Sequence, residues 1–255
     1  MAHHQKKLPR HKSVYILPNL FTTASLFIGF LGLIWAVQGE FELCAVGILA
    51  SCVFDGLDGK VARLTGTTSE FGVQLDSLAD LVAFGVTPAI TAYLWQLQHF
   101  GRLGLMACFL LVACGALRLA RFNVQSKVAS KKFFTGLPIP AAACTLATFI
   151  LFTQYVPEAW AAAIPVVCLV LVYCVSFLMV SNIRYASFKE YGMFKAHPFS
   201  AMVTVILLFV LVASRPKLLG FVFFVGYIAS GLIYTLFFMA RRSSRLLRES
   251  SDELS

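Results

Sequence analysis

The chain consists of long apolar runs separated by short polar connections. Runs long enough to cross a bilayer as helices, at 1.5 Å per residue, lie at about 14–37, 41–63, 73–98, 103–124, 137–157, 160–182, 197–214 and 217–240. We therefore predict an all-α fold, a polytopic membrane helix bundle with about eight transmembrane helices. The first six helices, within residues 14–182, are expected to form the core of the bundle.

Composition places the chain among membrane proteins and outside the soluble globular class. Of its 255 residues, 59% are hydrophobic and only 13% are charged, and the mean hydropathy is +0.80. The net charge of +9 does not indicate nucleic-acid binding, because the basic residues lie in the connections and not in a patch interleaved with aromatic side chains. We expect membrane lipids as partners and no nucleic acid.

The basic residues also predict an orientation. If the N-terminus starts on one side of the membrane, all but three of the 21 Lys and Arg residues fall on that side, the exceptions being Arg102, Arg215 and Lys217. By the positive-inside rule that side is the cytoplasm. We expect a multi-pass protein of the cell inner membrane with both termini cytoplasmic. Around the core we expect a basic cytoplasmic segment at 1–13, a surface segment with two further transmembrane helices at 183–240, and a cytoplasmic tail at 241–255.

Four acidic residues stand apart because they fall inside apolar runs. Eight of the twelve Asp and Glu residues lie in connections or in the tail, and the other four are Asp55, Asp58, Asp76 and Asp80. A charge at bilayer depth is costly, so such residues usually face a cavity, a partner or an ion. The i,i+3 and i,i+4 spacings place each pair on one helix face, and two facing helices would bring all four carboxylates together.

Four carboxylates at one point need cations to remain ionised, and all-oxygen ligation suits Mg²⁺, Mn²⁺ or Ca²⁺. We therefore predict a divalent metal site with two ions, on the cytoplasmic side. Between the acidic pairs, Gly56, Gly59 and Gly72 remove side chains where a ligand must approach the backbone, and Arg63 adds a planar cationic fork. Together with a metal, these residues suit a pyrophosphate. No Walker-type loop or GxGxxG motif accompanies them.

These residues follow the pattern D-x-x-D-G-x-x-A-R, then eight residues, then G-x-x-x-D-x-x-x-D. The pattern resembles the signature of the CDP-alcohol phosphotransferases, and every fixed position is matched, by Asp55, Asp58, Gly59, Ala62, Arg63, Gly72, Asp76 and Asp80. The resemblance implies that residues 14–182 are the six-helix catalytic core of this family and that the protein is a homodimer. It also implies two Mg²⁺ or Mn²⁺ ions on the four aspartates, with Asp80 as the general base.

The resemblance further implies that Asp58, Gly59, Arg63 and Gly72 bind the donor, CDP-diacylglycerol. Near the cytoplasmic end of the first apolar run, Asn19 and Thr22 are candidates to contact the same nucleotide. Their alternative role is to cap the helix or to hydrogen-bond a neighbouring helix.

Three later segments, GALRLARFN, GLPIP and MVSNIRYASFK, are similar to those of the bacterial and archaeal phosphatidylserine synthases within the family. This narrower resemblance implies transfer of the phosphatidyl group of CDP-diacylglycerol to the hydroxyl of L-serine, with release of CMP, in a single displacement. Arg118, Asn123 and Arg184 are then candidates to bind the serine carboxylate or the lipid phosphate. Plain anchoring at the membrane interface is their alternative role.

Two other functions remain open from the sequence. Another alcohol, such as glycerol 3-phosphate, inositol phosphate or choline, could accept the same donor, since only the later segments favour serine. Intramembrane carboxylates also mark ion pathways, as in a divalent-cation transporter. Transporters usually place such groups on several broken helices, whereas here they are confined to two adjacent helix ends. The enzyme is therefore the favoured hypothesis.

Overall fold

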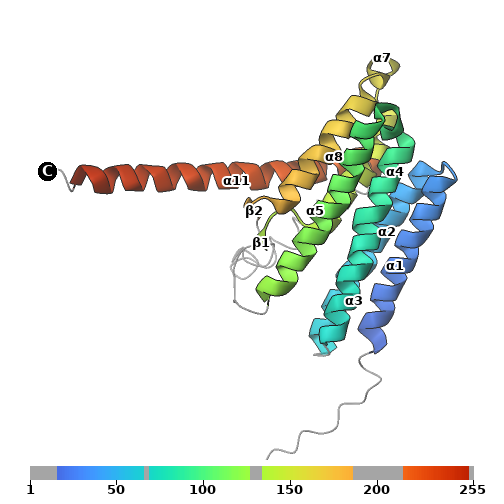
Figure 1. Ribbon diagram of the computed structural model, residues 1–255, viewed down its shortest axis with the longest axis horizontal. Coiled ribbons are helices and arrows are strands. Elements are labelled where there is room, and N and C mark those ends of the chain that lie inside the picture. Colours follow the sequence, from blue (N-terminus) through green and yellow to red (C-terminus); the bar gives the residue numbers. More distant parts are fainter. Residues whose placement is uncertain (1–15, 66–68, 127–133, 186–214, 253–255) are drawn as a thin grey trace, which may run out of the picture.

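The computed structural model describes residues 16–65, 69–126, 134–185 and 215–252, which form a helical bundle (Figure 1). Within these ranges, side chains are not described at 16–17, 63, 125–126, 134–135, 184–185, 216 and 236–252. The all-α prediction is confirmed, since a ribbon of two short strands is the only sheet in the described residues. The elements, in chain order, are α1 (Ile16–Val37), α2 (Phe41–Thr65), α3 (Glu70–Asp80), the π-helix η2 (Leu81–Val86), α4 (Thr87–Trp95), η3 (Leu97–Phe100), α5 (Arg102–Ser126), β1 (Phe134–Thr135), α6 (Ile139–Phe152), η4 (Thr153–Tyr155), α7 (Glu158–Ala161), α8 (Ile164–Val180), β2 (Arg184–Tyr185) and α11 (Pro216–Asp252).

The apolar runs of the described residues form helices, but only part of the predicted span count is supported. Four helical stretches are long and apolar enough to cross a membrane: Pro18–Val37, Glu70–Trp95, Arg102–Val124 and Lys217–Thr235. Two further apolar helices, Ile139–Tyr155 and Ile164–Val180, are shorter. Helix α2 carries Glu42 in its first turn and its other charged residues in its second half. The span expected at 197–214 lies outside the described residues, so the count of eight is not established.

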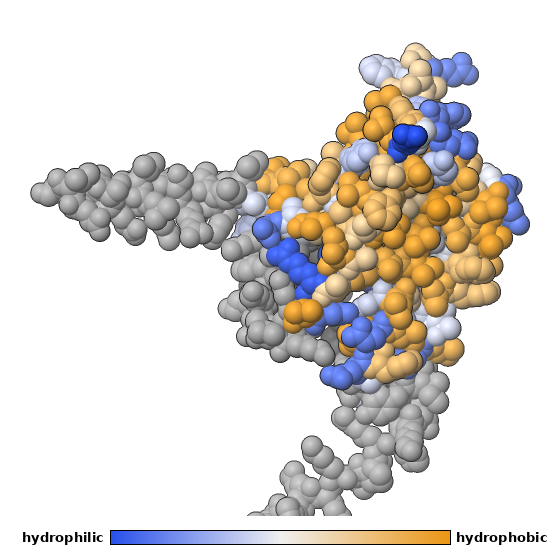
Figure 2. Space-filling model, in the orientation of Figure 1, coloured by the Kyte–Doolittle hydropathy of each residue, from blue (hydrophilic) through white to orange (hydrophobic). Residues whose placement is uncertain are grey.

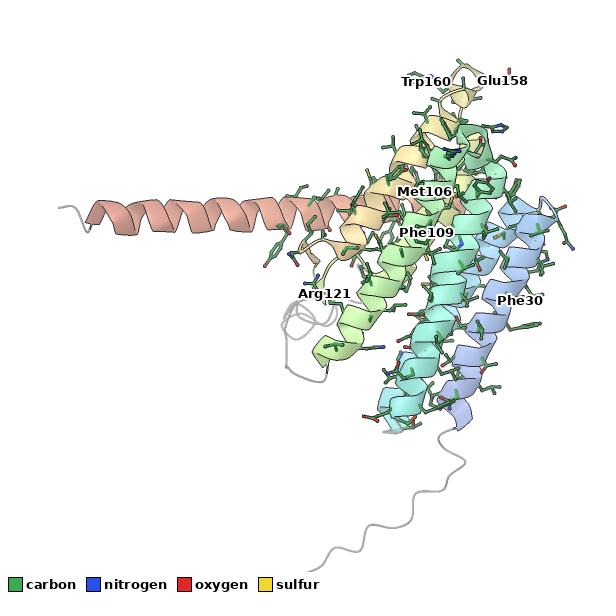
Figure 3. All side chains as sticks on the ribbon, viewed as in Figure 1. Phe30, Met106, Phe109, Arg121, Glu158 and Trp160 are labelled. Carbon is green, nitrogen blue, oxygen red and sulfur yellow. The ribbon has the colours of Figure 1, made fainter. Side chains whose placement is uncertain are left out.

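The exterior of the bundle is apolar. Figure 2 shows hydrophobic residues across the middle of the visible face and hydrophilic residues toward its two ends. Phe30 of α1 and Met106 and Phe109 of α5 point outward (Figure 3) and are half exposed or more. At the end opposite the start of α1 lie Glu158 and Trp160 of α7 (Figure 3). Such an exterior suits lipid and not water, and with the long apolar helices it identifies a membrane protein.

The most deeply buried helix is α6, which packs against α2, α8, α11 and η2. Its alanines let neighbouring helices approach closely, as is usual between membrane helices. The two buried hydroxyls of Thr145 and Thr148 donate to carbonyls one turn earlier in the same helix, each at 2.7 Å. These polar groups therefore add no unsatisfied hydrogen-bond donor to the core.

Close backbone approaches fix α1 against α2 and η2. The hydroxyl oxygens of Ser25 and Ser51 lie 2.7 Å apart, and Ser51 Oγ is also 2.9 Å from the Ser25 carbonyl. A Cβ atom at Gly29 would lie only 2.6 Å from the Cβ of Ala83 in η2, so only glycine permits this approach. Thr87, directly after η2, donates to the Gly29 carbonyl at 3.0 Å. The helices that carry the four aspartates are thus held in one rigid arrangement.

A short ribbon closes the end of the bundle where α6 begins. In it β1 pairs antiparallel with β2, and the amide of Gly136 donates to the Ile183 carbonyl at 2.9 Å. Arg121, at the end of α5 (Figure 3), donates from Nη2 to Asn182 Oδ1 at 2.8 Å. The segment before α6 is therefore tied to the segment after α8, which fixes where Pro138 and Pro140 lie.

The first half of α11 belongs to the bundle. Phe221 packs on Phe149 of α6 with ring centroids 5.3 Å apart. Lys217 Nζ lies 3.1 Å from Glu42 Oε2 and 2.6 Å from Gln154 Oε1. The second half of α11 projects beyond the other helices (Figure 1). The start of this helix therefore braces the bundle at the end remote from the aspartates.

Replacing Gly136 by alanine tests the ribbon. Gly136 has a φ of +86°, and a Cβ there would collide with the Met179 carbonyl. We expect Gly136→Ala to lower the free energy of unfolding by about 2–4 kcal/mol, measured by SDS-induced unfolding of micellar protein. The control is Gly39→Ala, where φ is +84° but no atom lies within 4 Å of the added Cβ; it should lose only about 1 kcal/mol. Equal losses in both variants would contradict the packing argument.

Candidate functional site

Three carboxylates meet where α2 and α3 face each other. Asp55 of α2 and Asp76 and Asp80 of α3 each offer one oxygen, and these three oxygens lie within 4.8 Å of one another. The i,i+4 spacing on α3 places Asp76 and Asp80 on one helix face. Like charges at this separation, with oxygen as the only donor atom, suit a hard divalent cation such as Mg²⁺, Mn²⁺ or Ca²⁺. The group could therefore hold a metal ion.

The fourth aspartate is placed differently. Asp58 is only 5% exposed, and its Oδ2 accepts a hydrogen bond from Thr22 Oγ1 of α1 at 2.7 Å. The Thr22 hydroxyl also lies 3.2 Å from the Pro18 carbonyl. Asp58 is thus engaged toward α1, beside the three-oxygen group and not within it. The sequence predicted that all four carboxylates would converge, and the structure gathers three at one point with the fourth adjacent.

A cavity of about 430 Å³ opens beside the carboxylates. Its wall on one side comes from α2 and α3 and includes all four aspartates. The opposite wall comes from α5 and from the residues that begin α6. The lining residues are Asp55, Gly56, Asp58, Gly59, Val73, Asp76, Ser77, Asp80, Arg118, Leu119, Phe122, Asn123, Pro138 and Pro140. A Cβ at Gly56 would meet nothing within 4 Å, so this glycine leaves open space at the wall.

A second, smaller cavity of about 160 Å³ lies on the α1 side and shares three of the same acidic and glycine residues, Asp58, Gly59 and Asp76. Asn19, Thr22 and Gly72 also line it. A Cβ at Gly72 would lie 3.3 Å from Asn19 Oδ1, so the missing side chain lets α1 and α3 approach. The sequence predicted that Gly59, Gly72, Asn19 and Thr22 would bind one ligand. In the structure these four residues line one cavity.

Residues of α5 supply the polar groups of the opposite wall. Arg118 lines the larger cavity, and its Nε is buried and has no hydrogen-bond partner in the described part of the chain. Asn123 Nδ2 donates to Ser77 Oγ at 2.9 Å. A buried guanidinium nitrogen without a partner is costly, so this position suits an anionic ligand.

For two of the expected site residues only the backbone is described. Arg63 lies in α2 and Arg184 in β2, but their side chains are outside the described set.

The sequence analysis did not identify Ser77, which lines the larger cavity. Its position three residues before Asp80 was the available signal, because residues at i and i+3 are neighbours on a helix surface. It also missed Ser69, whose hydroxyl accepts from the Gly72 amide at 3.0 Å and caps α3.

The arrangement combines three chemical properties at one end of a membrane bundle. The carboxylates can bind a cation, the guanidinium of Arg118 can neutralise an anion, and two adjoining cavities meet at Asp58, Gly59 and Asp76. A ligand with a phosphate group could therefore reach the metal position from one cavity while a second reactant occupies the other.

Comparison with known proteins gives an independent result. A sequence model of the CDP-alcohol phosphatidyltransferase family matches residues 15–171. The chain is 39% identical over 230 residues to the CDP-diacylglycerol–serine O-phosphatidyltransferase of Helicobacter pylori, covering 89% of this chain and 94% of that protein. It is 39% identical over 175 residues to the archaetidylserine synthase of Methanothermobacter thermautotrophicus, covering 68% and 70%. It is 33% identical over 156 residues to a protein of Mycobacterium tuberculosis that has the same name as the Helicobacter protein, covering 59% and 54%.

Removing the hydroxyl of Thr22 tests the placement of Asp58. In Thr22→Val the buried Asp58 carboxylate loses a hydrogen-bond donor, so we expect the free energy of unfolding to fall by about 1–3 kcal/mol in SDS titrations. The matched control is Thr23→Val, because the exposed Thr23 hydroxyl donates only to the Asn19 carbonyl of its own helix; its effect should stay within about 0.5 kcal/mol. An unchanged Thr22→Val protein would show that the bond does not hold Asp58.

Proposed function

The chain belongs to the CDP-alcohol phosphatidyltransferase family, and from this premise we propose that it transfers the phosphatidyl group of CDP-diacylglycerol to L-serine. The products are phosphatidylserine and CMP. The observation that carries the proposal is the meeting of Asp55, Asp76 and Asp80 beside a cavity, in a chain 39% identical over most of its length to a relative named for this reaction. In the reaction the serine Oγ–P bond forms and the bond from that phosphorus to the CMP phosphate breaks.

The aspartates are the proposed metal ligands. Two divalent ions, Mg²⁺ or Mn²⁺, would be held by Asp55, Asp58 and Asp76, with Asp80 at their edge. When bound, such ions neutralise the pyrophosphate and stabilise the charge that develops on the leaving CMP. The separation of the three carboxylate oxygens, all within 4.8 Å, fits this role. The Thr22 hydrogen bond would hold Asp58 in the orientation that the ions require.

The smaller cavity is the proposed seat of the CDP portion of the donor. Gly59 and Gly72 would let the nucleotide approach the backbone, with Asn19, Thr22 and Asp58 around it. All five residues line this cavity, which supports the assignment. Arg63 is proposed to contact the same portion through its guanidinium, which is suited to bidentate binding of phosphate.

Asp80 is the proposed general base. A serine hydroxyl is a weak nucleophile until its proton is removed, and the Asp80 carboxylate lines the cavity from which the acceptor would enter. The proton would pass from the serine Oγ to an Asp80 oxygen as the oxygen attacks phosphorus. No covalent enzyme intermediate is required, because donor and acceptor would occupy adjoining cavities.

The opposite wall is the proposed acceptor side. Arg118, whose Nε is buried without a partner in the described residues, would bind the serine carboxylate or the lipid phosphate. Asn123 and Arg184 are proposed as further residues of this acceptor side. Since other alcohols could use the same donor machinery, this wall would decide the choice of acceptor.

We propose a multi-pass inner-membrane location with the site and both termini cytoplasmic. The biased distribution of Lys and Arg in the sequence supports this orientation. A site at the cytoplasmic interface would admit a donor with two acyl chains from the lipid and a water-soluble acceptor from the cytoplasm. A homodimer is part of the proposal, as the family resemblance implies.

The deciding experiment is a transfer assay with purified protein in mixed micelles. Labelled L-serine, glycerol 3-phosphate, inositol phosphate and choline are each supplied with CDP-diacylglycerol and Mg²⁺ or Mn²⁺, and lipid product and CMP are measured. We expect product and stoichiometric CMP with serine alone, and no reaction in the presence of EDTA. Transfer to another alcohol would overturn the acceptor assignment, and the absence of CMP with every alcohol would favour the transporter.

Replacing Asp80 by asparagine tests the general base. We expect kcat to fall by roughly 10³-fold or more, because a neutral amide cannot accept the serine proton, while equilibrium binding of CDP-diacylglycerol is largely kept. The matched control is Glu42→Gln, a carboxylate at the remote end that pairs with Lys217, which should retain activity. Full turnover by Asp80→Asn would refute the assignment.

A further inference from the structure

Helices α3 and α5 contribute to opposite walls of the larger cavity. In Figure 1 the two helices diverge toward the end of the bundle where α3 begins. Near the middle of the bundle α5 packs against η2, the segment that follows Asp80. Farther along, the cavity separates α5 from α3. The distance between the carboxylates on one helix and Arg118 on the other therefore depends on what joins these helices beyond η2.

A side-chain hydrogen bond crosses this gap. Asn123 Nδ2 of α5 donates to Ser77 Oγ of α3 at 2.9 Å. The Ser77 hydroxyl itself donates to the Val73 carbonyl of its own helix at 3.0 Å. Because a serine hydroxyl has one proton and that proton is used within α3, its oxygen is left to accept from the Asn123 amide. The bond is therefore directed from α5 to α3.

This bond lies next to the residues of the site, so it can affect their positions. Ser77 follows Asp76 directly and precedes Asp80 by three residues, and all three line the cavity. Arg118 is five residues before Asn123, which is about 7.5 Å along α5. A bond that fixes Asn123 to Ser77 therefore also fixes how far Arg118 stands from Asp76 and Asp80.

We propose that Asn123 is a positioning residue and not a ligand of the acceptor, with Ser77 as its partner. The Asn123–Ser77 hydrogen bond holds the cavity at the width that brings a small polar acceptor between Arg118 and the carboxylates. This inference rests on the proposed function, because it assumes that the acceptor enters this cavity. It assigns Ser77 a role and changes the one that sequence analysis gave to Asn123.

A double-mutant cycle tests the proposal, with Ser77→Ala, Asn123→Ala and the double variant. If the two residues act through one bond, each single variant should lower kcat/KM for serine by about five- to tenfold, and the double variant should lose no more than the worse single. The KM for CDP-diacylglycerol should remain that of the unaltered protein. Ser77→Thr, which keeps the hydroxyl, should restore most of the activity. Ser176→Ala is the control, since that buried hydroxyl donates only within α8.

Other results would overturn it. If Asn123→Ala raises the serine KM while Ser77→Ala behaves like the unaltered protein, Asn123 contacts the acceptor directly. If the fold-losses in kcat/KM of the two single variants multiply in the double variant, the residues act independently, and this result would also refute a shared bond. If Asn123→Ala fails to fold, Ser77→Ala and Ser77→Thr alone decide. A required hydroxyl predicts that Ser77→Ala loses activity and that Ser77→Thr keeps most of it.

The cycle distinguishes failure of this inference from failure of the proposed function. If the unaltered protein prefers another alcohol, the serine assignment fails, and the cycle is run with that alcohol under the same criteria. The free energies of unfolding of the four proteins supply a readout that needs no reaction. Non-additive losses support the Asn123–Ser77 bond, and additive losses overturn it.

Discussion

Four carboxylates lie inside an apolar bundle, and the need to stabilise them explains the main features of the site. Charges at this depth are stable only when a cation, a hydrogen-bond donor or water compensates them. The protein gathers Asp55, Asp76 and Asp80 within reach of one another, gives Asp58 the hydroxyl of Thr22, and opens a cavity beside all four. The same grouping that would be unstable without a cation is what makes the site able to bind one.

Rigid packing holds these groups in register. The contact of Gly29 with Ala83, the paired hydroxyls of Ser25 and Ser51 and the bond from Thr87 to Gly29 join α1, α2 and the helix that carries Asp76 and Asp80. Within lipid, small residues and interhelical hydrogen bonds supply such stability where the hydrophobic effect cannot. The donor side of the proposed reaction is therefore built on closely packed helices.

The facing wall is built differently, from the end of α5 and the segment that begins α6. It is held by the ribbon at Gly136, by the bond from Arg121 to Asn182 and by the bond from Asn123 to Ser77. These hydrogen bonds join separate elements, and they add to the packing of α5 against α8 and of α6 against α2. Because this wall comes from other elements than those that carry the aspartates, a substitution there can alter the wall while the aspartates stay in place.

The helical class follows from the sequence alone, and residues 55–80 alone indicate the family and the aspartates of the site. This is possible because apolar run length and i,i+3 or i,i+4 spacing act within one helix. The sequence did not determine the number of spans, and it grouped Asp58 with the other three carboxylates. Only the tertiary structure placed Asp58 against Thr22 and brought Ser77 to Asn123, because each of these bonds joins residues at least 36 positions apart. Such contacts depend on how the helices pack, and no local spacing in the chain specifies that packing.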